Sequence, residues 1–339
     1  MQNKTALVTG ITGQDGAWLA KLLLEKGYTV VGAARRNSNR NLYGLKYLGI
    51  EEQVKIVDMD LLDYSNIYDV ITTIKPDEIY NLAAQSFVAA SFKQPLSTGM
   101  VDGMGVAYIL DIVKTFLPTT KVYQASTSEL YGKVVETPQK ETTPFYPRSP
   151  YAVAKQYAHW MMVNYRESYN IFATCGILFN HESELRGKEF VTRKITNHVA
   201  KYSLGDKEVL RLGNLNSSRD WGYAKDYVEG MYLMMQQDNP DTFVLATGTT
   251  TTIRDFVNHA YNAINIEVKW EGDGVDEKGF DANTGEQLVM VDPQFFRPAE
   301  VELLVGDATK AKEVLGWTPK TSLDELVKIM VDHDIKLNS

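Results

Sequence analysis

The chain has 339 residues and a formal net charge of −8, from 35 basic and 43 acidic side chains. This length predicts about two domains, or one large α/β unit with an attached lobe. The hydrophobic content of 44% and the charged content of 23% are typical of a globular protein and exclude a disordered or fibrous chain. The acidic balance also argues against the broad basic surface that a nucleic-acid-binding protein needs.

Cysteine use and apolar patterning indicate where the protein acts. Cys175 is the single cysteine, which excludes an internal disulfide and is typical of a reducing compartment. Residues 1–5 lead directly into a strand-like run without a signal-peptide pattern. No uninterrupted apolar stretch approaches the roughly 20 residues that span a bilayer. We therefore expect a cytoplasmic protein that uses neither a membrane nor nucleic acid as a partner.

Short strand-like runs alternate with helix-like segments through the first half of the chain. Strands are predicted over residues 5–9, 29–32, 54–57, 78–82, 121–124 and 171–178, and helices over 18–26, 103–115 and 152–169. Strands that alternate with crossover helices indicate a parallel sheet covered on both faces. Right-handed crossovers then give a Rossmann-like, doubly wound α/β fold.

The second half is less regular. Helices are predicted over residues 190–204, 226–237 and 323–332, turns or loops over 180–187, 211–220 and 316–319, and a mobile surface excursion over 271–285. We expect residues 1–178 to form the Rossmann-like domain, with 222–250 returning to it. Residues 179–221 and 251–339 are expected to form a smaller, interleaved α/β lobe that binds the substrate.

A glycine-rich segment follows the first predicted strand and opens the first helix. Its glycines are spaced G-x-x-G-x-x-G, and the segment contains Gly10, Thr12, Gly13, Gln14, Asp15 and Gly16. Glycines allow a tight turn and let backbone N–H groups approach a pyrophosphate at the helix N-terminus. The position of this segment between a strand and a helix predicts dinucleotide binding.

The end of the second predicted strand indicates which dinucleotide binds. An acid that would bond the ribose hydroxyls of NAD is missing there. Arg35 and Arg36 take its place, followed by Ser38. Two guanidinium groups match a 2′-phosphate in charge and in geometry, so NADP is favoured over NAD. The alternative is an arginine pair that only faces solvent.

Two further strand ends are candidates for cofactor contacts. Asp60 is expected to accept a hydrogen bond from the adenine amine while Leu61 packs on the ring, although an ordinary turn is an equal alternative. The fourth strand ends in mostly small residues that would let a cofactor lie close to the backbone. These residues are Leu82, Ala83, Ala84, Gln85 and Ser86.

Tyr151 and Lys155 are spaced i and i+4, which places them on one face of a predicted helix. A tyrosine titrates near ~10, and a neighbouring cation would lower its pKa toward that of a usable base. Coming roughly 140 residues after the glycine-rich segment, this pair has the spacing of a short-chain dehydrogenase/reductase.

The fifth strand ends in Thr127, Ser128 and Glu129. A carboxylate beside a hydride-transfer centre can remove a C–H proton next to a ketone and assist the loss of a hydroxyl, work that plain oxidation does not need. The alternative for Glu129 is an acid that complements a helix dipole.

These motifs resemble those of the GDP-mannose 4,6-dehydratases, a family of the extended short-chain dehydrogenase/reductase superfamily. The resemblance covers nearly the full length, and its most specific stretches are residues 145–151, 178–183 and 296–302. Ser128 occupies a place where dTDP-glucose dehydratases have Asp, which favours the branch that uses GDP-sugars.

The resemblance implies a role for each residue of the reaction centre. Thr127 would bond the C4 hydroxyl of the sugar and Tyr151 would take its proton, while Lys155 holds the nicotinamide ribose. Hydride would pass from C4 to NADP+, which leaves a 4-keto sugar with an acidified C5–H. Glu129 would then remove the C5 proton and help expel the C6 hydroxyl as water, and the hydride would return to C6.

The resemblance also implies binding residues from the second lobe. It assigns His181 and Arg186 to the cofactor. It assigns to the sugar nucleotide Ser86, Asn180, Val191, Lys194, Arg219, Arg297 and Glu300. A diphosphate needs fixed cations, which agrees with the lysine and the arginines. A metal site is not expected, because no second histidine or cysteine stands at ligand spacing from His181.

The pattern leaves several alternatives open. Phe87 stands where some family members have histidine, so the sugar could instead be a GDP-manno-heptose. A 4-reductase or epimerase of the same fold, and a non-catalytic NADP-binding sensor, are further alternatives. We expect a homo-oligomer, with a tetramer favoured over a dimer, although residues 39–47 lack the pattern of one tetrameric subset.

Overall fold

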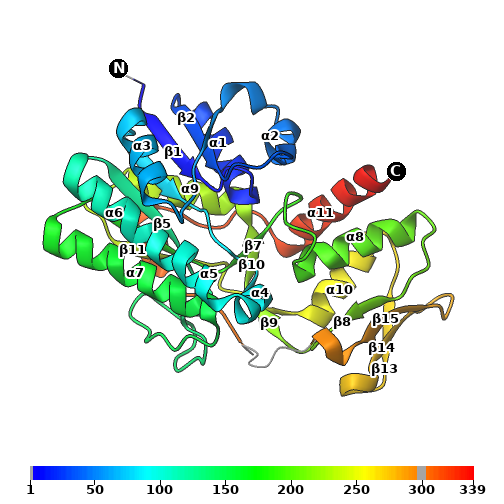
Figure 1. Ribbon diagram of the computed structural model, residues 1–339. Coiled ribbons are helices and arrows are strands. Elements are labelled where there is room, and N and C mark those ends of the chain that lie inside the picture. The colour runs from blue at the N-terminus through cyan, green and yellow to red at the C-terminus, as the bar shows by residue number, and fades with distance from the viewer. Residues whose placement is uncertain (1–2, 296–302) are drawn as a thin grey trace.

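The computed structural model describes residues 3–295 and 303–339 (Figure 1). Its largest element is a seven-stranded parallel sheet in the order β11-β6-β5-β4-β1-β2-β3. The strands are β1 (Thr5–Thr9), β2 (Thr29–Ala34), β3 (Lys55–Asp58), β4 (Glu78–Asn81), β5 (Lys121–Thr127), β6 (Ala173–Leu178) and β11 (Thr242–Leu245). The predicted Rossmann-like, doubly wound fold is confirmed.

Helices cover both faces of this sheet (Figure 1). One face packs against α1 (Gln14–Glu25) and α9 (Ala224–Met235), and the other packs against α3 (Tyr64–Ile74), α6 (Gly105–Phe116) and α7 (Pro150–Tyr169). Successive side chains of a strand point to opposite faces. Thus Ala6 and Val8 of β1 join the core under α1 and α9, while Leu7 joins the core under α6. A strand buried on both faces is apolar throughout.

One apolar stretch is longer than the sequence suggested. The helical run Pro95–Phe116, 22 residues, is long and apolar enough to cross a membrane by length and composition alone, so the prediction that no stretch approaches that length was wrong. It consists of α5 (Pro95–Gly99), a π-helical turn (Met100–Met104) and α6. However, 56% of its most apolar window is buried inside the protein, where the run packs against α3 and α7. This is the burial of a core helix.

The second half of the chain builds a smaller α/β unit. Its four-stranded sheet has the order β13-β14-β15-β8, with β8 (Leu210–Leu212), β13 (Val268–Glu271), β14 (Lys278–Asp281) and β15 (Gln287–Val291). This sheet shares an apolar core with α8 (Val191–Ser203), α10 (Ile253–Asn262) and α11 (Leu323–Asn338).

The predicted surface excursion over residues 271–285 was wrong. It contains β14, which pairs with β13 on one side and with β15 on the other. The glycines and acids that suggested a loop lie mostly in the turns around this short strand, whose Gly279 and Asp281 are buried.

Two short strand pairs connect the main sheet to the smaller unit. They are β7 (Asn180–Glu182) with β10 (Trp221–Tyr223), and β9 (Ser218–Arg219) with β12 (Thr251–Thr252). Residues 180–187 and 211–220, predicted as turns or loops, therefore contain strands, which are too short to show a periodicity. Two further short helices are α2 (Tyr43–Tyr47) and α4 (Val88–Lys93). The residue boundaries of the two units stay a prediction.

Candidate active site

A cleft of about 1340 Å³ opens where the carboxyl ends of the sheet strands face the smaller unit. The strand order reverses between β1 and β4, because β2 follows β1 to one side and β4 lies on the other. Ligands of doubly wound proteins bind at this topological switch point. The walls come from the ends of β1, β4, β5 and β6 on one side and from β7 and α8 on the other.

The cleft brings together most of the residues that the sequence predicted. Those that line it are Gly10, Thr12, Gly13, Gln14, Asp15, Gly16, Leu82, Ala84, Ser86, Thr127, Ser128, Glu129, Tyr151, Lys155, Asn180, His181, Arg186, Val191, Lys194 and Arg219. Those described but outside its lining are Arg35, Arg36, Ser38, Asp60, Leu61, Ala83 and Gln85. Arg297 and Glu300 lie outside the described residues.

The glycine-rich segment has the geometry of an anion cradle. Gly10 has a φ of +69°, and a Cβ on it would lie 2.9 Å from the backbone nitrogen of Ala83. A Cβ on Gly16 would lie 2.4 Å from the carbonyl oxygen of Gly10. Gly13 caps α1 without any side-chain hydrogen bond to the first-turn amides. Those amides and the helix dipole therefore fit a pyrophosphate.

The predicted 2′-phosphate residues lie just beyond the end of β2. Arg35, Arg36 and Ser38 are all exposed. Within the described ranges, the neighbouring acid at the end of β3, Asp58, pairs with Arg40 and not with either of these arginines. Both guanidinium groups therefore remain available to an anion next to the cleft.

Three of the predicted cofactor residues make structural contacts. The Leu61 side chain is buried in the core under α6, and Asp60 accepts a hydrogen bond from the backbone of Leu62. The Gln85 side chain donates to Thr98 and accepts from the backbone of Phe87. The adenine contacts predicted for Asp60 and Leu61 stay predictions.

The reaction centre gathers at the end of β5 and the first turns of α7. The Thr127 hydroxyl accepts from the backbone of Glu129 at 3.2 Å, and it lowers the pKa of the nearby Tyr151 phenol. Lys155 is buried, donates to the carbonyl oxygen of Ala125 at 3.1 Å, and places its Nζ 5.9 Å from the centre of the Tyr151 ring. Hydroxyl, phenol, ammonium and carboxylate thus line one wall.

The electrostatics of Tyr151 differ from the expectation. Burial raises the pKa of its phenol above the ordinary value, and the charges of Asp102 and Glu129 raise it further. The Thr127 hydrogen bond and the charge of Arg186 act in the opposite direction but do not outweigh them. Burial and the two carboxylates therefore outweigh the lowering of the Tyr151 pKa that a neighbouring cation was expected to give.

Asp102 is a charged group near the reaction centre that the sequence reasoning missed. It lies on the π-helical turn, is 1% exposed, and accepts a hydrogen bond from the backbone of Gln85 at 2.7 Å. Burial raises the pKa of its carboxyl to about 6. An acid inside an otherwise apolar helical stretch was the available signal.

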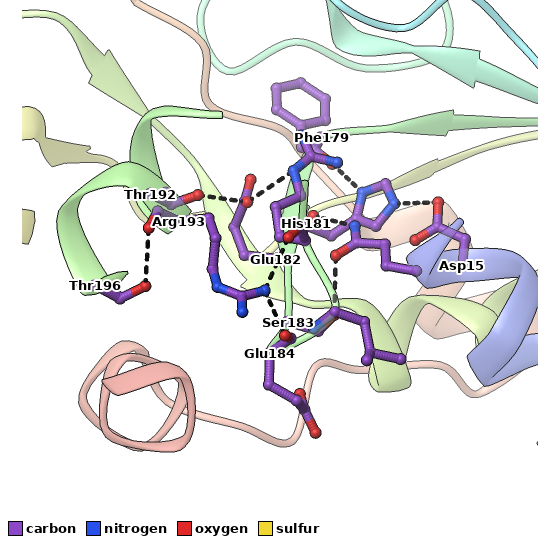
Figure 2. A network of polar contacts seen from close by, with 12 residues as sticks. Asp15, Phe179, His181, Glu182, Ser183, Glu184, Thr192, Arg193 and Thr196 are labelled. Carbon is purple, nitrogen blue, oxygen red and sulfur yellow. Dashed lines mark hydrogen bonds and ion pairs between the residues drawn. The ribbon is translucent and has the colours of Figure 1, made fainter. Parts of the chain in front are cut away.

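A polar network ties the cradle to the strand that follows β6 (Figure 2). His181 of β7 contacts the Asp15 carboxylate through Nε2 at 2.8 Å, and the Phe179 carbonyl oxygen through Nδ1 at 2.8 Å. Gln14 donates to the His181 carbonyl oxygen and accepts from the Ser183 hydroxyl. Two predicted cofactor residues of α1 are thereby fixed against the far wall.

Arg186 and its neighbours extend the same network toward α8. Arg186 pairs with Glu182 at 3.0 Å, and its guanidinium lies 3.7 Å from the ring centre of Phe190. Phe190 meets Phe87 edge-to-face at 6.0 Å, which joins α8 to α4 across the cleft. Sequence reasoning missed Phe190, because no local pattern identifies a contact made across a cleft.

Two cationic side chains of the smaller unit, Lys194 and Arg219, are candidates for binding the substrate. Lys194 donates to the carbonyl oxygen of Arg211 at 2.6 Å and lies 3.8 Å from the ring centre of Phe295. Arg219 is 8% exposed and donates to the carbonyl oxygen of Ser218 at 2.9 Å. Asn180 and Val191 line the same cleft.

Comparison with known proteins identifies the family. The family profile described as GDP-mannose 4,6 dehydratase matches residues 7–330. The chain belongs to this family. Among similar proteins, the GDP-mannose 4,6 dehydratase of Homo sapiens is 53% identical, covering 98% of this chain and 91% of that protein. The GDP-mannose 4,6-dehydratase of Sinorhizobium fredii is 51% identical, covering 98% and 97% respectively.

Solved structures of lower identity share the fold. A UDP-glucose 4-epimerase from Thermotoga maritima, solved with UDP-glucose, has a TM-score of 0.84 at 23% identity and covers 99% of this chain and 100% of its own. A dTDP-glucose 4,6-dehydratase from Bacillus anthracis, solved in complex with NAD, has a TM-score of 0.80 at 18% identity, covering 98% and 97%. These identities carry the fold and not the activity.

The Asp15–His181 pair predicts a pH-dependent stability. Burial disfavours both charges, but His181 together with Arg186 and Gln14 lowers the pKa of Asp15 overall. Asp15 together with the Phe179 carbonyl raises the pKa of His181 overall. The Asp15 contribution is lost as the pH falls through its lowered value, and the His181 contribution is lost as the pH rises through its raised value.

Asp15→Asn should therefore unfold at a lower temperature than the unchanged protein, with the largest difference between about pH 4 and pH 6.5. Thermal unfolding measured from pH 4 to pH 9 checks this. Asp63→Asn, which removes a carboxylate from an exposed helix cap, is the control. A difference for Asp15→Asn that stays constant with pH would contradict the ion-pair interpretation.

Proposed function

We propose that this chain is an NADP-dependent GDP-mannose 4,6-dehydratase that converts GDP-mannose to GDP-4-keto-6-deoxymannose and releases water. The observation that carries the proposal is the position of Glu129, which lines the same cleft as Thr127 and Tyr151. A carboxylate at that position supplies acid–base chemistry that a simple dehydrogenase does not use. The family membership of the chain supports the same activity.

The cradle and its surroundings fit a dinucleotide cofactor. The uncapped first turn of α1, the tight contacts of Gly10 and Gly16, and the cleft at the switch point suit its pyrophosphate. When bound, NADP accepts a hydride from the substrate and returns it later in the same turnover, so no external reductant is consumed. Arg35 and Arg36 would hold its 2′-phosphate, and Lys155 would hold the nicotinamide ribose.

The protein side chains then divide the proton transfers. Thr127 positions the sugar C4 hydroxyl against Tyr151, whose phenolate takes the hydroxyl proton as C4 becomes a ketone. The ketone acidifies the C5–H, and Glu129 removes that proton. Loss of the C6 hydroxyl as water creates a C5–C6 double bond, which is reduced by hydride at C6 and by a proton at C5. The net change is the loss of one water.

The smaller unit would bind the GDP portion. Lys194 and Arg219 lie in the cleft wall opposite the reaction centre and would contact the diphosphate, because fixed cations satisfy its charge. Asn180 and Val191 would complete this surface, and His181 and Arg186 would contact the cofactor. The proposal includes Arg297 and Glu300, which lie outside the described residues.

Incubation of the purified protein with GDP-mannose, without added reductant, tests the activity. We expect a product lighter by one water, found by mass spectrometry, with no net consumption of reduced cofactor. Parallel kinetics on GDP-mannose and a GDP-manno-heptose test the alternative substrate. The absence of any conversion of either sugar, with NADP still bound, would favour the non-catalytic sensor.

Glu129→Gln should stop dehydration while leaving C4 oxidation possible. The amide cannot accept the C5 proton, so turnover should fall by ~10²–10⁴-fold. Reduced cofactor should still form in a single turnover, which absorbance measures directly. Glu136→Gln, a nearby carboxylate outside the cleft lining that pairs with Lys140, is the matched control. Dehydration by Glu129→Gln at the unchanged rate would remove Glu129 from the proposal.

Arg35→Ala should weaken NADP binding by ~10–100-fold, the loss expected for a charge-assisted hydrogen bond. The affinity for NAD, which lacks the 2′-phosphate, should hardly change. Isothermal titration with both cofactors measures the two affinities on one protein. Equal losses for NADP and NAD would contradict the assignment of the arginine pair to the 2′-phosphate.

We further propose a homo-oligomeric, cytoplasmic enzyme. An exposed apolar surface runs over α5, the π-helical turn and α7, elements that contact one another. It contains Leu96, Met100, Val153, Tyr157 and Trp160. A shallow groove along α7 carries a single charged side chain, Glu167. A second copy of the chain is the occupant we favour, because one surface pairs with itself around a two-fold axis.

Trp160→Glu should shift the protein toward monomer in size-exclusion chromatography with light scattering. Burying a charge at the centre of this surface would cost roughly 2 kcal/mol or more of association free energy. Val275→Glu places the same charge at an exposed apolar residue of the smaller unit and serves as the control. An unchanged mass for Trp160→Glu would exclude this surface, and the mass of the unchanged protein distinguishes dimer from tetramer.

A further inference from the structure

The π-helical turn Met100–Met104 carries one acid, Asp102, which lies near the reaction centre but outside the lining of the cleft. The turn interrupts an otherwise continuous helical run, and such π-bulges are frequent at functional sites. Its Gly103 is pressed against α7, since a Cβ there would lie 3.2 Å from the Tyr157 ring and 3.4 Å from the Ala154 carbonyl oxygen. The carboxylate of Asp102 is thereby buried beside the helix that carries Tyr151 and Lys155.

The two oxygens of this carboxylate have different surroundings. Oδ1 accepts from the backbone of Gln85, in the segment that follows β4. Oδ2 is buried and has no hydrogen-bond partner within residues 3–295 and 303–339. A buried oxygen without a partner is costly, so its retention asks for a role beyond packing. A neutral apolar residue would fill the same space at lower cost.

The charges around this carboxylate identify that role. Lys155 is 3% exposed, and its ammonium donates to the neutral Ala125 carbonyl oxygen. Among the described residues, the charge of Asp102 raises the pKa of this ammonium, against the burial that lowers it. The pKa of Tyr151 is raised by the charges of Asp102 and of Glu129, just after β5, and lowered by that of Arg186, in the loop after β7.

We propose that Asp102 is a positioning residue for the Tyr151–Lys155 pair, whose buried carboxylate keeps the Lys155 ammonium charged and fixed at the back of the cleft. The same carboxylate, through its hydrogen bond to the Gln85 backbone, ties that pair to the β4 segment that lines the cofactor side of the cleft. The kinetic consequences of this inference rest on the proposed function, but the charge interaction between Asp102 and Lys155 does not.

Asp102→Asn separates the charge from the hydrogen bond, because the amide oxygen still accepts from Gln85. The charge of Asp102 raises the pKa values of both Lys155 and Tyr151, so its removal should lower both. Both limbs of the pH profile of GDP-mannose dehydration should then move toward lower pH by about one unit, the effect of one charge a few Å away. The ratio of activity at pH 6 to activity at pH 9 should rise about tenfold or more.

The matched control is Asp111→Asn, which removes the same charge from the same helical run. Asp111 is half-buried on α6 and pairs with Lys114 at 3.3 Å, outside the lining of the cleft. Its pH profile should superimpose on that of the unchanged protein. A profile of Asp102→Asn that only scales down without moving would overturn the proposal, because a purely structural residue would act that way.

Thermal unfolding from pH 4 to pH 8 tests the charge without any turnover. The pKa of Asp102 is raised to about 6, so the folded protein gains stability at low pH that is lost as the pH rises through 6. Asp102→Asn lacks this loss. The unfolding temperature of Asp102→Asn minus that of the unchanged protein should therefore increase by a few degrees from pH 4 to pH 8.

The two measurements keep the proposals apart. If the unchanged protein fails to dehydrate GDP-mannose, the proposed function is wrong, while the unfolding series still decides whether Asp102 is ionised in its buried site. If Asp102→Asn unfolds at the same temperature offset at every pH, or at a lower temperature at pH 8 than at pH 4 relative to the unchanged protein, the inference about Asp102 is wrong.

Discussion

A chain of buried hydrogen bonds across the carboxyl edge of the main sheet sets the geometry on which the site depends. The Thr9 hydroxyl, at the end of β1, donates to Asn81 of β4 at 2.7 Å, and Asn81 donates to Gln124 of β5 at 2.7 Å. Gln124 donates to the Ala125 carbonyl oxygen, which also accepts from Lys155. These hydrogen bonds fix the glycine-rich cradle, the end of β4 and the reaction centre relative to one another.

The distance across the cleft depends on a second set of buried polar contacts. Gln14 and Asp15, in the first turn of α1, bond His181 and Ser183 of the segment that enters the smaller unit. The network then continues to α11, because Arg193 of α8 forms a buried ion pair with Asp334. A helix that opens under the cradle is therefore connected to the last helix of the chain. Removing one partner of such a pair strands a buried charge, so these contacts constrain the two units strongly.

Local patterns predicted the parts of the fold and site that local sequence encodes. The strands and helices that were predicted in the first half lie within a few residues of their observed ranges, because their apolar runs are buried on both faces of one sheet. The helices α2, α3, α4 and α5 were not predicted. The cradle and the Tyr151–Lys155 spacing are likewise contained in single segments. The strands of the second half, β7 to β15, were missed, because runs of two to five residues show no clear periodicity.

Contacts between segments far apart in the sequence could not be predicted from local patterns. The core position of Leu61 depends on Gly105 of α6, which leaves room for it, and nothing near Leu61 encodes that space. The Phe87–Phe190 contact and the Asp102 environment are also made between elements far apart in the chain. The raised pKa of Tyr151 belongs to the same class, because burial by several elements decides it and the i+4 lysine does not.

The electrostatics of the reaction centre follow from combining two chemistries in one wall. Glu129 has to be an acid for the proposed dehydration, yet its charge raises the pKa of Tyr151 and opposes the phenolate that the oxidation step uses. Arg186 and Thr127 lower the pKa of Tyr151 and so partly offset the effect of this second carboxylate. The net charge of −8 is a sum over the whole chain, whereas binding depends on where charges lie, and Arg186, Lys155 and Arg219 are buried or partly buried cations that line the cleft.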